Sequence, residues 1–286
     1  MAHRVRQELV YALAITLAGC STTTPYVGQG PYPHITRGHP IPPVDFLGNV
    51  FALPIKLILW NWHVDDHAIS ERTESYLVRY IDAPQSVTED THFSLNEYAP
   101  GRALKRLVTN RKVAWPYRLI IGLPVTLIID VLLPGRLFGG LIGGDNYNPY
   151  TDTVSIYSDL PSVALHEAGH AHDFNTKRFK GTYALVRLIP FVDLYQEFQA
   201  TDEALGYLIE TGEQQEELAA YKVLYPAFGT YVGGYLFIIG GGLIGAVVGH
   251  ICGRAKARSQ AQYYASMHQA SSSSSPSISA QPIPAQ

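Results

Sequence analysis

Two histidines four positions apart are the first feature of this sequence that could carry out chemistry. They are His166 and His170, and Glu167 directly follows the first. On a helix, residues four apart lie on the same face, so both imidazoles can bind a single Zn²⁺. Glu167 would then lie beside the metal, where a carboxylate can act as a general base toward water. The stretch therefore predicts a zinc site that activates water.

The segment before the histidine pair predicts how that pair is positioned. Apolar and polar residues alternate toward the end of 148–157, as they do in a half-buried strand. Ser158 or Asp159 can cap the helix that follows, and Pro161 suits its first turn. We expect this helix to run from about 160 to 175, so that a strand leads by a tight turn into the helix that carries the histidines.

A zinc site needs a third protein ligand, and a second helix predicted over 194–208 offers one. Glu197 and Glu203 both lie on this helix, beside a stripe of apolar residues that would pack it against the protein. Asp173 lies one turn beyond His170, where it could orient a ligand, serve as one, or be a solvated helix acid.

The strand, the turn and the His-Glu-x-x-His helix together resemble the zincin fold, in which an edge strand lines the substrate cleft and can pair with an extended peptide. The second helix is similar to the Glu-x-x-Ala-Asp-x-x-Ala helix of gluzincins such as the membrane-bound prenyl-protein peptidases. Glu197, Ala200 and Ala204 match that pattern, and Thr201 stands where the family has aspartate. The likeness covers about residues 147 to 208.

This resemblance implies a ligand set of His166, His170 and Glu197, with Glu203 in reserve. It implies Zn²⁺ as the cofactor, Glu167 as the general base, and hydrolysis of peptide bonds in a protein or peptide substrate. In the family, the aspartate supports the first histidine. Losing such support typically weakens metal affinity or activity by roughly tenfold to a hundredfold.

Further side chains remain open to more than one interpretation. The group that would stabilise the oxyanion formed when a carbonyl is attacked is not identifiable. His172, Tyr183 and Tyr207 are candidates, but for each an ordinary structural role on a helix or in the core is favoured. The stretch 62–67 places two histidines around two aspartates, which is typical either of a metal cluster or of a solvated helix start.

The N-terminal residues indicate localisation in the cell envelope. Residues 1–19 combine two arginines, an apolar run and a Leu-Ala-Gly sequence before Cys20, which resembles the lipobox of bacterial lipoproteins. We therefore expect cleavage before Cys20, lipidation of this cysteine, and a metal site on the extracytoplasmic side. The Pro-rich residues 20–44 favour an extended tether.

Apolar stretches predict contact with a membrane. Region 45–142 contains two, at 46–62 and 113–142, and both are interrupted by proline. Segment 227–252 is predicted to be a transmembrane helix, because it carries no acidic or basic side chain except one histidine and is followed by basic residues. The tail 253–286 starts with these basic residues, and its end is expected to be disordered. Whether the chain crosses the membrane once or three times remains open. Glycines spaced four apart in 227–252 favour either self-association or a lone anchor.

Composition agrees with these expectations. With 47% hydrophobic and 16% charged residues, the chain can bury a sizeable core, and its low charge favours membrane association. A net charge of -3 gives no reason to expect nucleic acid as a partner, and the two cysteines imply no disulfide framework. We expect an α+β, mostly helical, zincin-like domain with its metal-binding region at 143–226, plus membrane-associated helices. A membrane-anchored zinc peptidase is the favoured function, and a non-catalytic envelope lipoprotein that binds metal or a membrane partner is the alternative.

Overall fold

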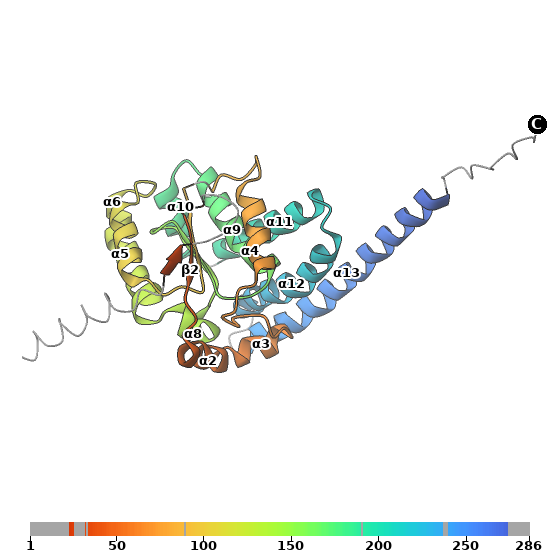
Figure 1. Cartoon of the computed structure of the whole chain (residues 1–286), viewed down its shortest axis with the longest axis horizontal. Coiled ribbons are helices and arrows are strands. Elements are labelled where there is room, and N and C mark those ends of the chain that lie inside the picture. The colour runs from red at the N-terminus through yellow and green to blue at the C-terminus, as the bar shows by residue number, and fades with distance from the viewer. Residues whose placement is uncertain are drawn as a thin grey trace, which may run out of the picture.

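A computed structural model describes residues 23–25, 32, 34–88, 90–189, 191–236 and 240–273. Within these residues the chain is mostly helical and surrounds one small mixed sheet, which confirms the α+β class (Figure 1). The sheet has the order β1-β2-β3-β5-β4, parallel in the middle and antiparallel at both edges. Its strands are β1 (Thr23–Pro25), β2 (Ile35–Gly38), β3 (His92–Leu95), β4 (Asn146–Asn148) and β5 (Thr153–Ile156).

The two faces of the sheet differ in polarity, because side chains alternate along each strand. Phe93, Val154 and Ile156 point into the main hydrophobic core. That core also contains residues of α4 (Glu71–Ile81) and α9 (Pro161–Thr176). The neighbouring strand positions, such as Ser94 and Ser155, are buried but polar. One face of the sheet therefore supports the helix that carries the two histidines.

The main core joins segments from both sides of position 142. Leu77 of α4 and Leu95 of β3 pack in the same cluster as Leu165 and Leu208. The expected division into an apolar region 45–142 and a metal-binding region 143–226 therefore does not appear in the fold. The sequence-based boundary followed the apolar stretches, whereas the core is defined by contacts between segments distant in the chain.

The predicted tether 20–44 is wrong for its described residues, because β1 and β2 both lie within it and pair with each other. Ile35 of β2 is 2% exposed, and β2 lies between β1 and β3 within the sheet. The prolines that suggested a tether flank this strand and leave its backbone free for ladder hydrogen bonds. The signal segment 1–19 and Cys20 lie outside the described residues.

Several helices pack around this core. The first part of the chain forms α2 (Pro42–Phe51), α3 (Leu53–Leu59), α5 (Pro100–Thr109), α6 (Trp115–Tyr117), η1 (Arg118–Gly122), α7 (Leu123–Thr126), η2 (Leu127–Leu132) and α8 (Gly135–Ile142). The second part forms α10 (Lys180–Val186), α11 (Val192–Glu210), α12 (Gln214–Leu236) and α13 (Gly241–Ser273). Figure 1 shows α2, α3 and α8 beside one another and α13 extending well beyond the body.

The single transmembrane helix predicted over 227–252 is wrong. Gly240 has a positive φ of 72°, α12 ends before it, and α13 begins after it. The two helices pack against each other as a hairpin. Their backbones are so close that a Cβ on Gly233 would lie 2.0 Å from the carbonyl oxygen of Gly241. The glycine spacing therefore serves contacts within the chain and needs no second copy. The tail expected from 253 is helical as far as Ser273, and the residues beyond lie outside the described part.

Among the described residues, one helical segment, Trp115–Leu132, is long and apolar enough to cross a membrane. Only 11% of it is buried inside the protein. The stretch 46–62 overlaps the pair α2 and α3, whose axes differ by 52° and which is long and apolar enough to cross a membrane only if the two helices are taken as one broken span.

Candidate metal centre

Helix α9 presents the histidine pair as predicted, with bounds within one residue of those expected. Pro161 is its first residue, where a missing N–H costs no helical hydrogen bond. The predicted capping by Ser158 or Asp159 is wrong. Asp159 accepts hydrogen bonds from the backbone and hydroxyl of Ser70 and thereby fixes the start of α4.

Helix α11 crosses α9 at very short range. A Cβ on Gly169 would lie 2.9 Å from the carbonyl oxygen of Ala200, so only glycine allows this approach. The buried face of α11 includes Glu197, Ala200 and Ala204. Phe198, on the same helix, is 52% exposed and does not belong to this face. The close crossing brings Glu197 to the two histidines.

Three metal-ligating side chains converge between the two helices. One ligand atom from each of His166, His170 and Glu197 lies within 4.8 Å of the others. The Glu197 carboxylate oxygens lie 3.2 Å from His166 Nε2 and 3.4 Å from His170 Nε2. Two imidazoles and one carboxylate leave a coordination position open and suit Zn²⁺. The structure thus brings together the ligand set that the sequence implied.

Thr201 lies behind the first histidine. Its hydroxyl is 3.3 Å from His166 Nδ1, while Nε2 of the same ring faces Glu197. A hydrogen bond at Nδ1 fixes ring orientation and leaves Nε2 as the metal-ligating atom. The site therefore gives His166 a hydrogen-bond partner at Nδ1, and that partner is a neutral hydroxyl.

Burial sets the protonation of these groups. It lowers the pKa of His170 to about 4, so this ring is neutral and has a free lone pair near neutral pH. It raises the pKa of Glu167 to about 8. Burial alone would raise the pKa of Glu197 too, but the neighbouring His170 and the hydrogen bonds from both histidines hold it well below its ordinary value. The ligand carboxylate is therefore ionised, and Glu167 has the raised pKa of a group that exchanges protons.

The other carboxylates proposed from the sequence lie elsewhere. Glu203 accepts a hydrogen bond from Tyr80 at 2.8 Å, and Asp173 is paired with Lys177 at 2.6 Å. Neither belongs to the cluster of ligand atoms around Glu197. Of the carboxylates considered as the third ligand, Glu197 is therefore the one that lies with the two histidines.

The three candidate oxyanion groups also point away from the site. Tyr183 donates its hydroxyl to Asp173, His172 lies 3.8 Å from a carboxylate oxygen of Glu203, and Tyr207 packs edge-on against Tyr80. These side chains belong to the supporting structure.

Two side chains that the sequence did not single out belong to the site. Arg187, directly after α10, donates to Glu197 Oε1 at 2.5 Å and to Gln196 at 3.3 Å. Tyr231 of α12 lines the cavities on both sides of the ligands. Their elements approach α9 only in the folded chain, so no sequence spacing could have indicated them.

Two cavities meet at Glu167 and Glu197. The smaller, of about 180 Å³, is walled mainly by α9, α11 and α12. The larger, of about 360 Å³, reaches past His170 between α8, α10 and the helical segment 115–132. Together they form a cleft that passes the metal-ligating residues on both sides.

The strand that borders this cleft is β4, not β5. β5 precedes α9 as predicted but is paired on both sides, whereas β4 is at the edge of the sheet. All three β4 residues, Asn146, Tyr147 and Asn148, line the larger cavity. The prediction of an edge strand in the cleft thus holds for a neighbouring strand.

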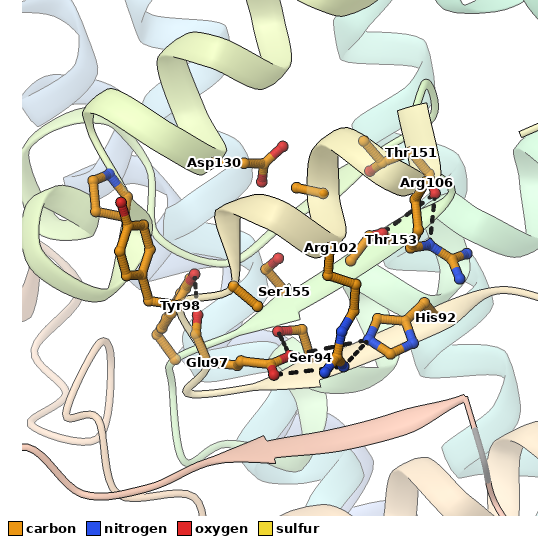
Figure 2. A pocket seen from close by; sticks show the side chains of 14 residues that line it. His92, Ser94, Glu97, Tyr98, Arg102, Arg106, Asp130, Thr151, Thr153 and Ser155 are labelled. Carbon is orange, nitrogen blue, oxygen red and sulfur yellow. Dashed lines mark hydrogen bonds and ion pairs between the residues drawn. The ribbon is translucent and has the colours of Figure 1, made fainter. Parts of the chain in front are cut away.

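Other polar clusters lie apart from this centre. His63, Asp66 and Asp159 come close at the surface, but His67 from the same stretch is buried and bonded to Asn96. A third cavity, of about 40 Å³, lies on the polar face of the sheet. Figure 2 shows the side chains that line it. Its Arg102 is 3.5 Å from Glu97 and 3.3 Å from His92, so its charges compensate one another. None of its lining residues lines the cleft at the histidines.

No family model, curated protein or solved structure matches this chain.

Proposed function

We propose that this protein is a zinc-dependent peptidase of the bacterial cell envelope. The observation that carries the proposal is the convergence of His166, His170 and Glu197 within 4.8 Å, with Glu167 lining the same cleft. A neutral imidazole, a second imidazole oriented by a hydroxyl and an ionised carboxylate form a donor set suited to Zn²⁺. Zn²⁺ bound there would supply Lewis acidity toward a carbonyl and a water molecule.

The protein's own groups supply the proton transfers and the positioning. Glu167 lines the cleft beside the ligands, where as a carboxylate it accepts a proton from the attacking water and returns it to the leaving amine. Tyr231 lines the cavities on both sides of the ligands, and we assign its hydroxyl as the donor toward the oxygen on which negative charge develops. The edge of β4 offers backbone groups to an extended peptide in the cleft. Arg187 fixes the Glu197 carboxylate through a charged hydrogen bond.

The proposed address follows from Cys20 and the apolar helices. A lipid on Cys20 would hold the protein at the membrane, with the metal centre on the extracytoplasmic side. The exposed apolar segment Trp115–Leu132 supports membrane association independently.

The test compares zinc content and peptidase activity in the full chain, purified in detergent without chelator. We expect about one zinc per chain in the parent and in Glu167→Gln, with cleavage of a peptide library by the parent only. His170→Ala should lose zinc, whereas Glu203→Gln should keep both zinc and activity, because Glu203 lies outside the cluster. A parent that carries no zinc, or a Glu167→Gln variant that cleaves like the parent, would contradict the proposal.

One observation favours a second function, that of a non-catalytic metal-binding lipoprotein. Thr201 gives His166 a neutral partner in place of a carboxylate, which lowers the basicity of the ligand. In that case zinc would be bound as above, but the parent would cleave no peptide in a broad library.

A further inference from the structure

The mouth of the larger cavity beside the metal-ligating residues is apolar. The aliphatic residues that line it are Ile121, Val125, Ile129, Ile142 and Leu188. Leu188 is 65% exposed and Ile142 is 49% exposed, so both reach the outer surface. A substrate that enters here passes over aliphatic side chains before it reaches Glu167.

This mouth lies within a much larger exposed apolar surface. Four parts of the chain contribute to it. They are α2 with α3, the segment 115–132 with α8, the end of α10 with the residues that follow it, and the end of α12 with the first part of α13. Their exposed large apolar residues are Phe46, Leu47, Val50, Leu53, Leu57, Leu119, Ile120, Ile128, Leu132, Leu133, Leu141, Ile142, Leu185, Leu188, Ile189, Phe191, Leu236, Leu243, Ile244, Val247, Val248 and Ile251. We call this set the apolar surface. Patches of this size on a folded protein mark a site of interaction.

Ring contacts connect these four parts of the chain. Phe51 of α2 stacks on Phe138 of α8 at 5.8 Å. Phe191, after α10, lies 4.8 Å from Tyr235 of α12. Trp60, directly after α3, stacks on His250 of α13 at 4.1 Å. Each of the four parts therefore contacts at least one of the others, and two of them also line the larger cavity.

The order of residues along α13 follows the depth profile of a lipid leaflet. From Leu243 to Ile251 the exposed side chains are aliphatic, a rise of about 12 Å at 1.5 Å per residue, which is close to half the hydrocarbon thickness. Trp60 and Arg254 come next, with the guanidinium 4.9 Å from the indole ring. Exposed basic residues follow, and α13 contains no acidic residue.

The tryptophans give independent support for a bilayer as the partner. The chain has three, Trp60, Trp62 and Trp115, and all are more than 60% exposed. Tryptophan is normally largely buried in a soluble fold, but it is enriched at the boundary between hydrocarbon and head groups. All three stand at the ends of apolar segments, next to α3 or at the start of the segment 115–132.

We propose that the apolar surface inserts into one leaflet of a lipid bilayer, and that the metal centre therefore receives its substrate from the bilayer through the apolar mouth. The substrate class is a membrane-embedded protein whose apolar segment lies along the mouth while the adjoining extended stretch reaches Glu167. The second half of this inference rests on the proposed peptidase function, and the first half does not.

Insertion is tested by tryptophan fluorescence of the full chain in vesicles of zwitterionic and anionic phospholipids that carry brominated acyl chains. Three variants that each keep one tryptophan, with the others changed to phenylalanine, report the positions separately. We expect loss of fluorescence at all three, stronger with bromine near the head-group end than at the chain terminus. A tryptophan introduced by Val87→Trp in a background without the others should keep its fluorescence, because Val87 lies outside the apolar surface. Unquenched native tryptophans would overturn the proposal.

The substrate route is tested with two peptides that share one cleavage sequence, one soluble and one joined to an apolar helix in vesicles. We expect the parent to prefer the membrane-bound peptide, and Leu188→Asn to reduce this preference roughly tenfold, as a polar group in an apolar site would. Val87→Asn is the matched control and should keep the preference. Equal cleavage of both peptides by the parent would overturn the substrate route. Cleavage of neither would overturn the peptidase function, while the quenching result would still decide on insertion.

Discussion

At the scale of single residues, the centre depends on groups that orient or complement the ligands. His166 presents Nε2 to Glu197 because Thr201 contacts its other nitrogen. The histidine spacing and Glu167 could be identified from sequence alone, because both are local to one helix. Arg187 and Tyr231 could not, because their contacts with the site arise only when α10 and α12 pack against α9.

The Thr201 hydroxyl should influence zinc affinity. We predict that Thr201→Val, which keeps the shape but removes the hydrogen bond to His166, weakens zinc binding about tenfold or more. Competition with a chromogenic zinc chelator measures this. Thr201→Ser keeps the hydroxyl and should bind within about threefold of the parent. Equal affinity in Thr201→Val and the parent would remove Thr201 from the account of the site.

Tyr231 should act on the rate and not on metal binding. Because it lines the cleft on both sides of Glu197, we predict that Tyr231→Phe keeps zinc and lowers kcat by about 10²–10³, as loss of an oxyanion donor does. Steady-state kinetics with parallel zinc analysis provides the measurement. Tyr225→Phe, on the same helix but outside both cavities, is the control and should keep kcat. An unchanged kcat in Tyr231→Phe would mean that the oxyanion is stabilised by another group.

At the scale of elements, the site depends on how closely α9 and α11 approach each other. The small residues Ala200 and Ala204 of the second helix are recognisable in the sequence, and Gly169 against Ala200 shows how such residues permit the approach. The sequence did not predict β2, because the flanking prolines obscured a short strand that is stabilised by β1 and β3. Nor did it predict the hairpin at Gly240, because 227–252 was interpreted as one apolar span, although the consecutive glycines Gly240, Gly241 and Gly242 are typical of a turn. Both elements are formed by contacts with other segments: β2 pairs with β1 and β3, and α12 packs against α13.

The helix crossing gives a prediction with a matched control. Gly169→Ala should lower the free energy of unfolding by about 1–3 kcal/mol, because the added Cβ meets the backbone of Ala200. Zinc affinity should fall with it, since Glu197 moves away with α11. Gly206→Ala, in the interior of α11 where a Cβ meets nothing within 4 Å, should instead stabilise by about 0.4–1 kcal/mol. Denaturant unfolding compares the two, and a neutral Gly169→Ala would contradict the packing described.

At the scale of the whole molecule, the centre connects parts of the chain that no local pattern links. The ligands come from α9 and α11, whereas the cleft walls come from α8, α10, α12 and the segment 115–132. The apolar stretches can be recognised in the sequence, where each is expected to be a separate membrane-associated segment. The fold shows that several of them also form the walls of the metal cleft, which requires the tertiary arrangement and could not be obtained from hydropathy.

Metal should stabilise the entire fold, because it joins two core helices. With zinc at about a hundredfold excess over Kd, binding contributes about 2.7 kcal/mol, so a chelator should lower Tm by roughly 5–10 °C. Added zinc should restore the parent value. His170→Ala should melt at the same temperature with and without chelator. A chelator-insensitive parent would mean that the cluster holds no stabilising metal.

The central claim is that His166, His170 and Glu197 hold one zinc ion. X-ray absorption at the zinc edge, on the full chain in detergent, tests it most directly. We predict nitrogen and oxygen neighbours at about 2.0–2.1 Å, two imidazole rings in the parent, and one imidazole fewer in any zinc that remains in His170→Ala. A sulfur shell, a six-coordinate oxygen shell without imidazole, or the same two-imidazole spectrum in His170→Ala would contradict this assignment.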